Sequence, residues 1–367
     1  MAPMMTRGMC GALVIGLAVA CGGDEAREVG APWGGQGGGG LDGGVGDDDG
    51  GSVGEDPSDA SGTSSAPETG LDASSGGGAD DGGTAGDDGS GDDSTPPWGD
   101  CPANCYCEPF DLSADIGDLE ASFTGNNWAD VMIGVLERRY PAGADLLVEM
   151  QDDPWFGAFT DTSSFTGLMD SVMTEVHEGT HGWDYGHALG QPYFGYWLRA
   201  DLIFEPPKVD GFPRSEIAPM LADDSTSLYA GTYLTGTQGT YGFYELLDEM
   251  NSYINGMGGI AAVGEHIPWG ISGRDGAVAF MYYLQLYLRR ARTTYPELYA
   301  QLQAEPEYVD LIRTQWLRLH FLLEQADAHP HLGIHDDEIR AHMHELSNQE
   351  EIETFIGQPI DASNCLP

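Results

Sequence analysis

The residues best placed to carry out chemistry are two histidines four positions apart, with a glutamate directly after the first. His177, Glu178 and His181 form an HExxH pattern. Residues four apart in a helix lie on one face about one turn from each other, so each imidazole can give a nitrogen to a single Zn²⁺. Bound zinc acidifies a water molecule and polarises a carbonyl group, and Glu178 can then act as the general base. The pattern predicts hydrolytic chemistry.

The segment around His177 resembles the zincin metallopeptidases, in which the HExxH motif lies on a helix. The resemblance covers only this helix and does not identify a subfamily. It implies a zincin-like catalytic domain, one Zn²⁺, and a metalloendopeptidase that hydrolyses a peptide or protein substrate. It also implies a third protein ligand further along the chain.

One candidate for that third ligand is His187, which falls at the position used by the metzincins. Asp184 stands where those proteins have glycine, whose freedom lets the chain leave the helix sharply. If the helix continued through Asp184, His187 would lie about 15 Å along the axis from His177, out of reach of the metal. Met257, in a turn predicted at residues 255–258, would correspond to the methionine turn of the same proteins.

The gluzincins instead use a glutamate from a second helix, and a helix predicted at residues 241–254 offers Glu245 and Glu249. These lie four apart on one face, so one could bind zinc while the other holds a ligating imidazole. We prefer Glu249, because Ser252 follows it by three positions as small residues often follow the third ligand in zincins. His187 and Glu245 remain alternatives.

Other polar residues receive weaker predictions. A donor for the developing oxyanion is needed, and the spacing does not choose among four candidates, which are Tyr253, Tyr244, His266 and Arg214. Five histidines of the C-terminal part could form a second metal site, but their irregular spacing favours positions in loops and on helix surfaces; they are His329, His331, His335, His342 and His344.

The elements that must position these residues are mostly helical. The apolar periodicity from about residue 164 predicts a long helix that carries the HExxH motif and stops at Gly182 or Gly186. Residues 193–204 have the composition of a strand or extended segment. The other predicted helices cover residues 126–139, 145–150 after a break at 141–143, 241–254, much of 276–325, 336–346 and 350–356. The fold class is therefore mainly α (α+β), with a small β element.

Composition divides the chain into three parts. Residues 1–21 have the layout of a secretory signal, residues 22–100 are rich in glycine, aspartate and serine, and residues 101–367 contain regularly spaced aromatic and aliphatic side chains. The middle part lacks the apolar side chains that could offset the entropy of ordering its backbone, so we predict a disordered acidic linker. The catalytic domain is predicted at residues 101–367.

Charge excludes one class of partner. The net charge is −46; residues 101–367 hold 41 of the 60 acidic and 12 of the 14 basic residues, which leaves them at −29. Nucleic-acid affinity rests largely on Lys and Arg displacing counterions from phosphates. We therefore expect no nucleic-acid partner.

The N-terminal segment resembles a bacterial lipoprotein signal that ends at Cys21. The resemblance implies cleavage before Cys21, a lipid on its sulfur, and an exported protein anchored to the cell envelope, at the outer membrane or cell surface. An ordinary secretory signal is the alternative.

Four cysteines follow the linker: Cys101, Cys105, Cys107 and Cys365. Export to an oxidising compartment suggests two disulfides, one within the first three cysteines and one to Cys365, although a metal site of all four is the alternative.

The sequence thus predicts an exported, lipid-anchored zinc-dependent hydrolase. The rival hypothesis is a noncatalytic cell-surface binding lipoprotein that keeps the HExxH helix as a structural or relic metal site.

Overall fold

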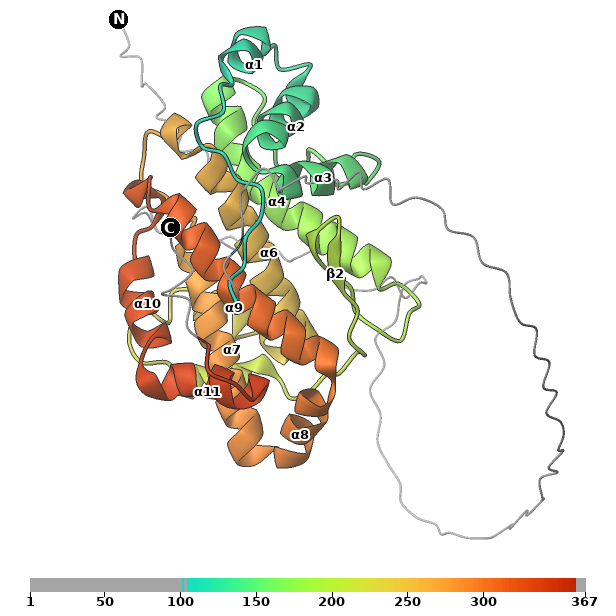
Figure 1. Ribbon diagram of the computed structural model, residues 1–367, viewed down its shortest axis with the longest axis vertical. Helices are drawn as coiled ribbons and strands as arrows, with labels where there is room; N and C mark the ends of the chain where they lie inside the picture. Colours follow the sequence, from blue (N-terminus) through green and yellow to red (C-terminus); the bar gives the residue numbers. More distant parts are fainter. Residues whose placement is uncertain (1–100, 102–103, 361–367) are drawn as a thin grey trace, which may run out of the picture. The chain divides into compact units, whose positions relative to one another are not determined.

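Helices make up most of the residues that this computed structural model describes, which are residue 101 and residues 104–360 (Figure 1). A small two-stranded sheet accompanies them. The prediction of a mainly α fold with a small β element is confirmed. The helices are α1 (Gly117–Ser122), α2 (Trp128–Arg139), α3 (Pro141–Glu149), α4 (Phe165–His187), α5 (Ala230–Tyr233), α6 (Phe243–Ala262), α7 (Asp275–Thr294), α8 (Pro296–Ala304), α9 (Pro306–Ala326), α10 (Asp336–Met343) and α11 (Leu346–Ile356).

Helix α4 carries the HExxH motif, and its N-terminus forms as predicted. The hydroxyl of Ser164 accepts a hydrogen bond from the backbone N–H of Gly167 at 3.0 Å, which satisfies one of the free donors of the first turn. Of the two predicted stops, Gly182 is wrong and Gly186 lies one residue before the observed end, because the helix continues to His187. Asp184 explains the difference: its buried carboxylate accepts hydrogen bonds that tie the last turn to the rest of the fold.

Helix α6 is the central helix, and it is longer than predicted. Residues 255–258, predicted as a turn, lie within it and are buried. Contacts with α4, α7 and α9 surround α6 (Figure 1). Burial on all sides stabilises this glycine-containing segment as helix, since the cost of a glycine in a helix is only about 1 kcal/mol. Met257 is a core residue of α6 and does not form a methionine turn.

The glycines of α6 allow close contact with α4. A Cβ atom at Gly256 would lie 3.0 Å from the backbone oxygen of Met173 and 3.2 Å from Cβ of His177. A Cβ at Gly259 would lie 3.2 Å from side-chain carbons of Val172 and Val176. The two helices therefore pack at a separation that larger side chains on α6 would prevent.

The sheet pairs β1 (Tyr196–Arg199) with β2 (Leu202–Phe204) in antiparallel fashion, within the segment predicted to be extended. Strand β1 contacts α3, α4 and α6. Its backbone helps to hold α6, since the side chains of Asn251 and Asn255 both donate hydrogen bonds to the carbonyl oxygen of Trp197.

Prolines set the start of three helices. Pro296 and Pro306 begin α8 and α9, so the predicted helical region 276–325 is three helices. Two separate helices form here as predicted, but the break lies at Tyr140 and residues 141–143 belong to the second helix, because Pro141 begins α3. Proline fits the first helical turn, where its missing N–H would have no helical partner.

Near the start of the described chain, Cys101 and Cys107 form a disulfide, and Cys105 is also disulfide-bonded. Cys21, Cys365 and the predicted signal and linker lie outside the described residues, so the predictions about them stay predictions. Within the described part, none of the helices combines the length and apolar character needed to cross a membrane.

Candidate metal centre

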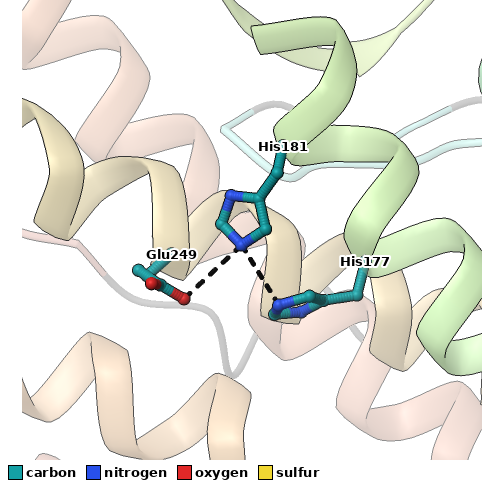
Figure 2. A group of neighbouring side chains, drawn as sticks. All are labelled: His177, His181 and Glu249. Carbon is teal, nitrogen blue, oxygen red and sulfur yellow. Dashed lines mark hydrogen bonds and ion pairs between the residues drawn. The ribbon is translucent and has the colours of Figure 1, made fainter. Parts of the chain in front are cut away.

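Three side chains from α4 and α6 bring their donor atoms together (Figure 2). The Nε2 atoms of His177 and His181 are 3.2 Å apart, and Nε2 of His181 is 3.5 Å from Oε2 of Glu249. All three donor atoms lie within 4.8 Å of one another. This cluster of His177, His181 and Glu249 could hold a metal ion.

The packing of the two helices determines this grouping. Ser252 and Gly256 present small side chains or none to α4, so α6 approaches the face that carries both histidines. Glu249 lies about one turn before Ser252 on the same helix, and it therefore reaches the imidazoles.

Two of the donor separations match those expected around a tetrahedral metal ion. Zn–N bonds of 2.0–2.1 Å, for example, place two ligands of a tetrahedron about 3.3 Å apart, close to the separations of 3.2 and 3.5 Å that His181 makes. The separation of His177 from Glu249 is within 4.8 Å. Oε2 of Glu249 is buried and, beyond the ion pair with His181, has no hydrogen-bond partner among the described residues. A buried carboxylate oxygen without a hydrogen bond is costly, and a bound cation would satisfy it.

Asp248 orients one of the imidazoles. Its Oδ2 lies 2.7 Å from Nδ1 of His181, and the hydroxyl of Ser252 lies 3.2 Å from the same nitrogen. A proton on Nδ1 leaves the Nε2 lone pair directed at the cluster, which is the usual support of a metal-bound histidine. The sequence analysis predicted that Glu245 or Glu249 would hold an imidazole in this way, and it did not identify Asp248. The sequence signal that could have identified Asp248 is its position four residues before Ser252, which places both on the face of α6 toward α4.

His177 lies deeper than His181. It is 6% exposed, and its ring packs edge-to-face on Tyr253 with 4.5 Å between the ring centres. Burial, with a further contribution from His181, lowers the pKa of His177 to about 3. The imidazole is therefore neutral at ordinary pH, as a metal ligand must be.

Two carboxylates, Asp248 and Glu249, raise the pKa of His181, whereas the pKa of His177 is lowered. Burial alone would lower the pKa of His181, but the negative charges of Asp248 and Glu249 outweigh it and raise the pKa well above its usual value. Burial would raise the pKa of Glu249, yet the nearby His181 and Arg214 leave it lowered. The two carboxylates thus favour a positive charge beside His181.

Glu178 lies beside the cluster and is only partly buried. Burial is the main cause that raises its pKa to about 7, while the nearby His181 opposes the rise and Glu249 adds to it. A carboxylate with a pKa near neutrality can both accept and return a proton.

The structure separates the alternative ligands from the cluster. Nε2 of His187 lies 2.6 Å from Oε1 of Glu205, and its ring stacks on Trp183. Glu245 accepts a hydrogen bond from the backbone N–H of Gly242 and caps the start of α6. Both side chains therefore have structural contacts of their own.

Two of the four candidate oxyanion donors lie at the cluster. Tyr253 packs on His177, and Nη2 of Arg214 is 3.8 Å from Oε1 of Glu249. Tyr244 packs on Phe194, and His266 packs on Phe165.

The C-terminal histidines make separate contacts. His342 lies between Asp223 and Glu345, whereas Nε2 of His344 is 3.2 Å from Nε2 of His320. Within the described part of the chain, these histidines do not bring three donor atoms together as the α4 and α6 residues do.

Comparison with known proteins adds no relative. The chain matches no protein-family model, and no significant match is found among the curated proteins or the solved structures.

Proposed function

We propose that the protein is a zinc-dependent hydrolase of peptide bonds, similar to the zincins. We further propose that it acts outside the cytoplasm, held at the membrane by a lipid on Cys21. One observation carries the proposal: the donor atoms of His177, His181 and Glu249 lie within 4.8 Å of one another, with Glu178 directly after the first histidine. Neutral imidazole and carboxylate donors suit zinc. The lipid anchor and the export rest on the resemblance of the N-terminal segment alone.

In this proposal each residue has a distinct role. His177, His181 and Glu249 hold the ion, which when bound would activate water and polarise the substrate carbonyl. Asp248 keeps the proton of His181 on Nδ1. Glu178 accepts a proton from the attacking water and then donates it to the leaving amine, which its raised pKa favours.

The test is metal analysis and digestion of a peptide library, with single substitutions at the candidate residues. Glu178→Ala should keep zinc and lose cleavage, because Glu178 is not a ligand. Glu249→Ala should lose zinc. His187→Ala and Glu245→Ala are the matched controls and should retain zinc. Wild-type protein that takes up no zinc would end the proposal.

A second candidate is a noncatalytic surface lipoprotein with a structural metal ion. Its support is the burial of the donors, because His177 and Glu249 are only 6% and 8% exposed and structural zinc sites are closed. The same assay separates the two. A structural ion would be retained by wild type and by Glu178→Ala, with no cleavage by either.

A further inference from the structure

Beside the candidate metal centre, Arg214 is a buried cation with an unused donor. Its side chain is fully buried, and its Nη1 has no hydrogen-bond partner among the described residues. Its Nη2 is 3.8 Å from Oε1 of Glu249, too far for a hydrogen bond. The end of the guanidinium thus lies next to the proposed third ligand.

The guanidinium is held in place from its other edge. Nε donates to the carbonyl oxygens of Tyr233 at 2.8 Å and Gln238 at 2.9 Å, and Nη2 donates to Oε1 of Gln238. The rings of Tyr233 and Tyr241 each lie 5.4 Å from its central carbon. These contacts fix the plane of the group before any ligand arrives.

Charge balance shows what is missing. A buried cation is costly unless an anion pairs with it, and the carboxylate that the structure brings near Arg214 is Glu249. In the proposed function, Oε2 of Glu249 binds the metal ion while Oε1 faces Arg214. Arg214 then shares the single negative charge of Glu249 with that ion, although the rest of the domain is strongly acidic.

We propose that Arg214 binds a carboxylate of the substrate, so that the enzyme selects peptides with a carboxylate close to the bond that it cleaves. The two N–H groups at the end of a guanidinium match the two oxygens of a carboxylate. This inference rests on the proposed function and adds the substrate class. The carboxylate is either the free C-terminus of a peptide or an Asp or Glu side chain within it.

A substrate carboxylate accounts for the arrangement better than an oxyanion. The oxyanion exists only during the reaction, so it would leave Arg214 with only a share of the charge of Glu249 in the bound complex before the reaction begins. A carboxylate carries its full charge throughout binding. It therefore stabilises the buried guanidinium in the ground state as well.

The experiment uses the zinc-loaded full chain and two pairs of peptides. The first pair has one sequence, made once with a free C-terminal carboxylate and once with a C-terminal amide. The second pair consists of two amidated peptides that differ only in having Glu or Gln beside the cleaved bond. We expect kcat/KM to be at least about tenfold higher for the charged member of one pair, since charge-assisted hydrogen bonds discriminate at this level. The responding pair identifies the source of the carboxylate.

Arg214→Met should abolish this preference, while Arg214→Lys should retain part of it because the charge remains. The matched control is Arg290→Met, which removes an ion pair to Glu216 on the same 3₁₀ helix as Arg214 and should keep the full preference. Equal rates within both pairs for wild type would overturn the inference without affecting the proposed hydrolase. A preference that persists in Arg214→Met would overturn it too.

A binding measurement separates this inference from the proposed catalysis. If the wild type cleaves neither peptide of either pair, calorimetry compares the free acid and the amide of an acetylated dipeptide on the zinc-loaded protein. Binding of the acid at least about tenfold tighter than the amide, lost in Arg214→Met, would support the carboxylate site. Equal binding of acid and amide would refute it.

Discussion

The two imidazoles of the candidate centre have different neighbours. His181 is supported by Asp248 at Nδ1, whereas His177 packs against the ring of Tyr253. With a metal ion at Nε2, Asp248 would accept the hydrogen bond of the proton that remains on Nδ1. Without Asp248, the proton could occupy Nε2 and compete with the metal.

Asp248→Ala should weaken zinc affinity by about 10- to 100-fold, because the imidazole loses its orienting acceptor. Competition with a chromogenic chelator measures the change. Asp170→Ala is the matched control, since Asp170 is a partly buried carboxylate on α4 that accepts a hydrogen bond from Trp269 and not from an imidazole. Equal zinc affinities for the two variants would contradict the role of Asp248.

How well the sequence predicted individual residues depended on their separation along the chain. His177 and His181 belong to one helix, so the helical period alone placed them together. Glu249 could be named only as one of three candidates, because its approach depends on how α6 docks. Arg214 could be named only as one of four possible oxyanion donors. Its burial depends on how the segment before α6 packs, which the local sequence does not show.

At the scale of elements, the close packing of α4 and α6 determines the centre. Gly256 and Gly259 lie where α6 contacts α4, and a side chain at either position would meet α4 atoms. Any change that separates the helices should therefore affect both stability and metal binding.

Gly256→Val should destabilise the protein by about 1–3 kcal/mol, since the added carbons would press against Met173 and His177. Zinc affinity should fall as well, because the shift carries Glu249 away from the histidines. Denaturant unfolding and zinc titration test the two effects. Unchanged affinity in a destabilised variant would show that the α4 and α6 contact does not determine the geometry of the centre.

Gly186 of α4, in contrast to Gly256, has room for a side chain. It is exposed within α4, and a Cβ there would meet nothing within 4 Å. Gly186→Ala should stabilise the protein by about 0.5–1 kcal/mol by favouring the helix, with no change in zinc affinity. A lower melting temperature would refute this.

Glycines also explain where the predicted elements failed. The sequence suggested that α4 ends at Gly182 or Gly186 and that residues 255–258 form a turn. A glycine in a helix costs about 1 kcal/mol relative to alanine, and the tertiary contacts of these helices outweigh that cost. Asp184 anchors the end of α4, and burial surrounds α6. Neither contact can be read from the local sequence.

At the scale of the whole molecule, the strong negative charge of residues 101–367 should act on substrates before they reach the centre. Peptides with basic residues away from the cleaved bond should be cleaved faster than acidic ones at low salt, because opposite charges accelerate encounter. The difference in kcat/KM should shrink as sodium chloride rises toward 1 M, where screening is nearly complete. A preference that does not depend on salt would point to specific contacts instead.

Metal binding should also stabilise the entire fold. If zinc binds the folded chain alone, free zinc at 100 times its Kd should add about 2.7 kcal/mol to the free energy of unfolding. Because α4 and α6 are held by extensive apolar packing, chelation should lower the melting temperature while helix content persists at 25 °C. Circular dichroism with and without a chelator tests both statements. Loss of helicity on chelation would contradict them.

The contact between His181 and Asp248 joins residues 67 positions apart in the chain. Closing so long a loop costs entropy before any contact compensates for it, so such a contact forms late in folding. A chain synthesised only as far as α4 has the HExxH motif but neither Glu249 nor Asp248. The complete metal centre therefore assembles only after α6 has been made and has docked, and the appearance of tight zinc binding in a refolding experiment would time that docking step.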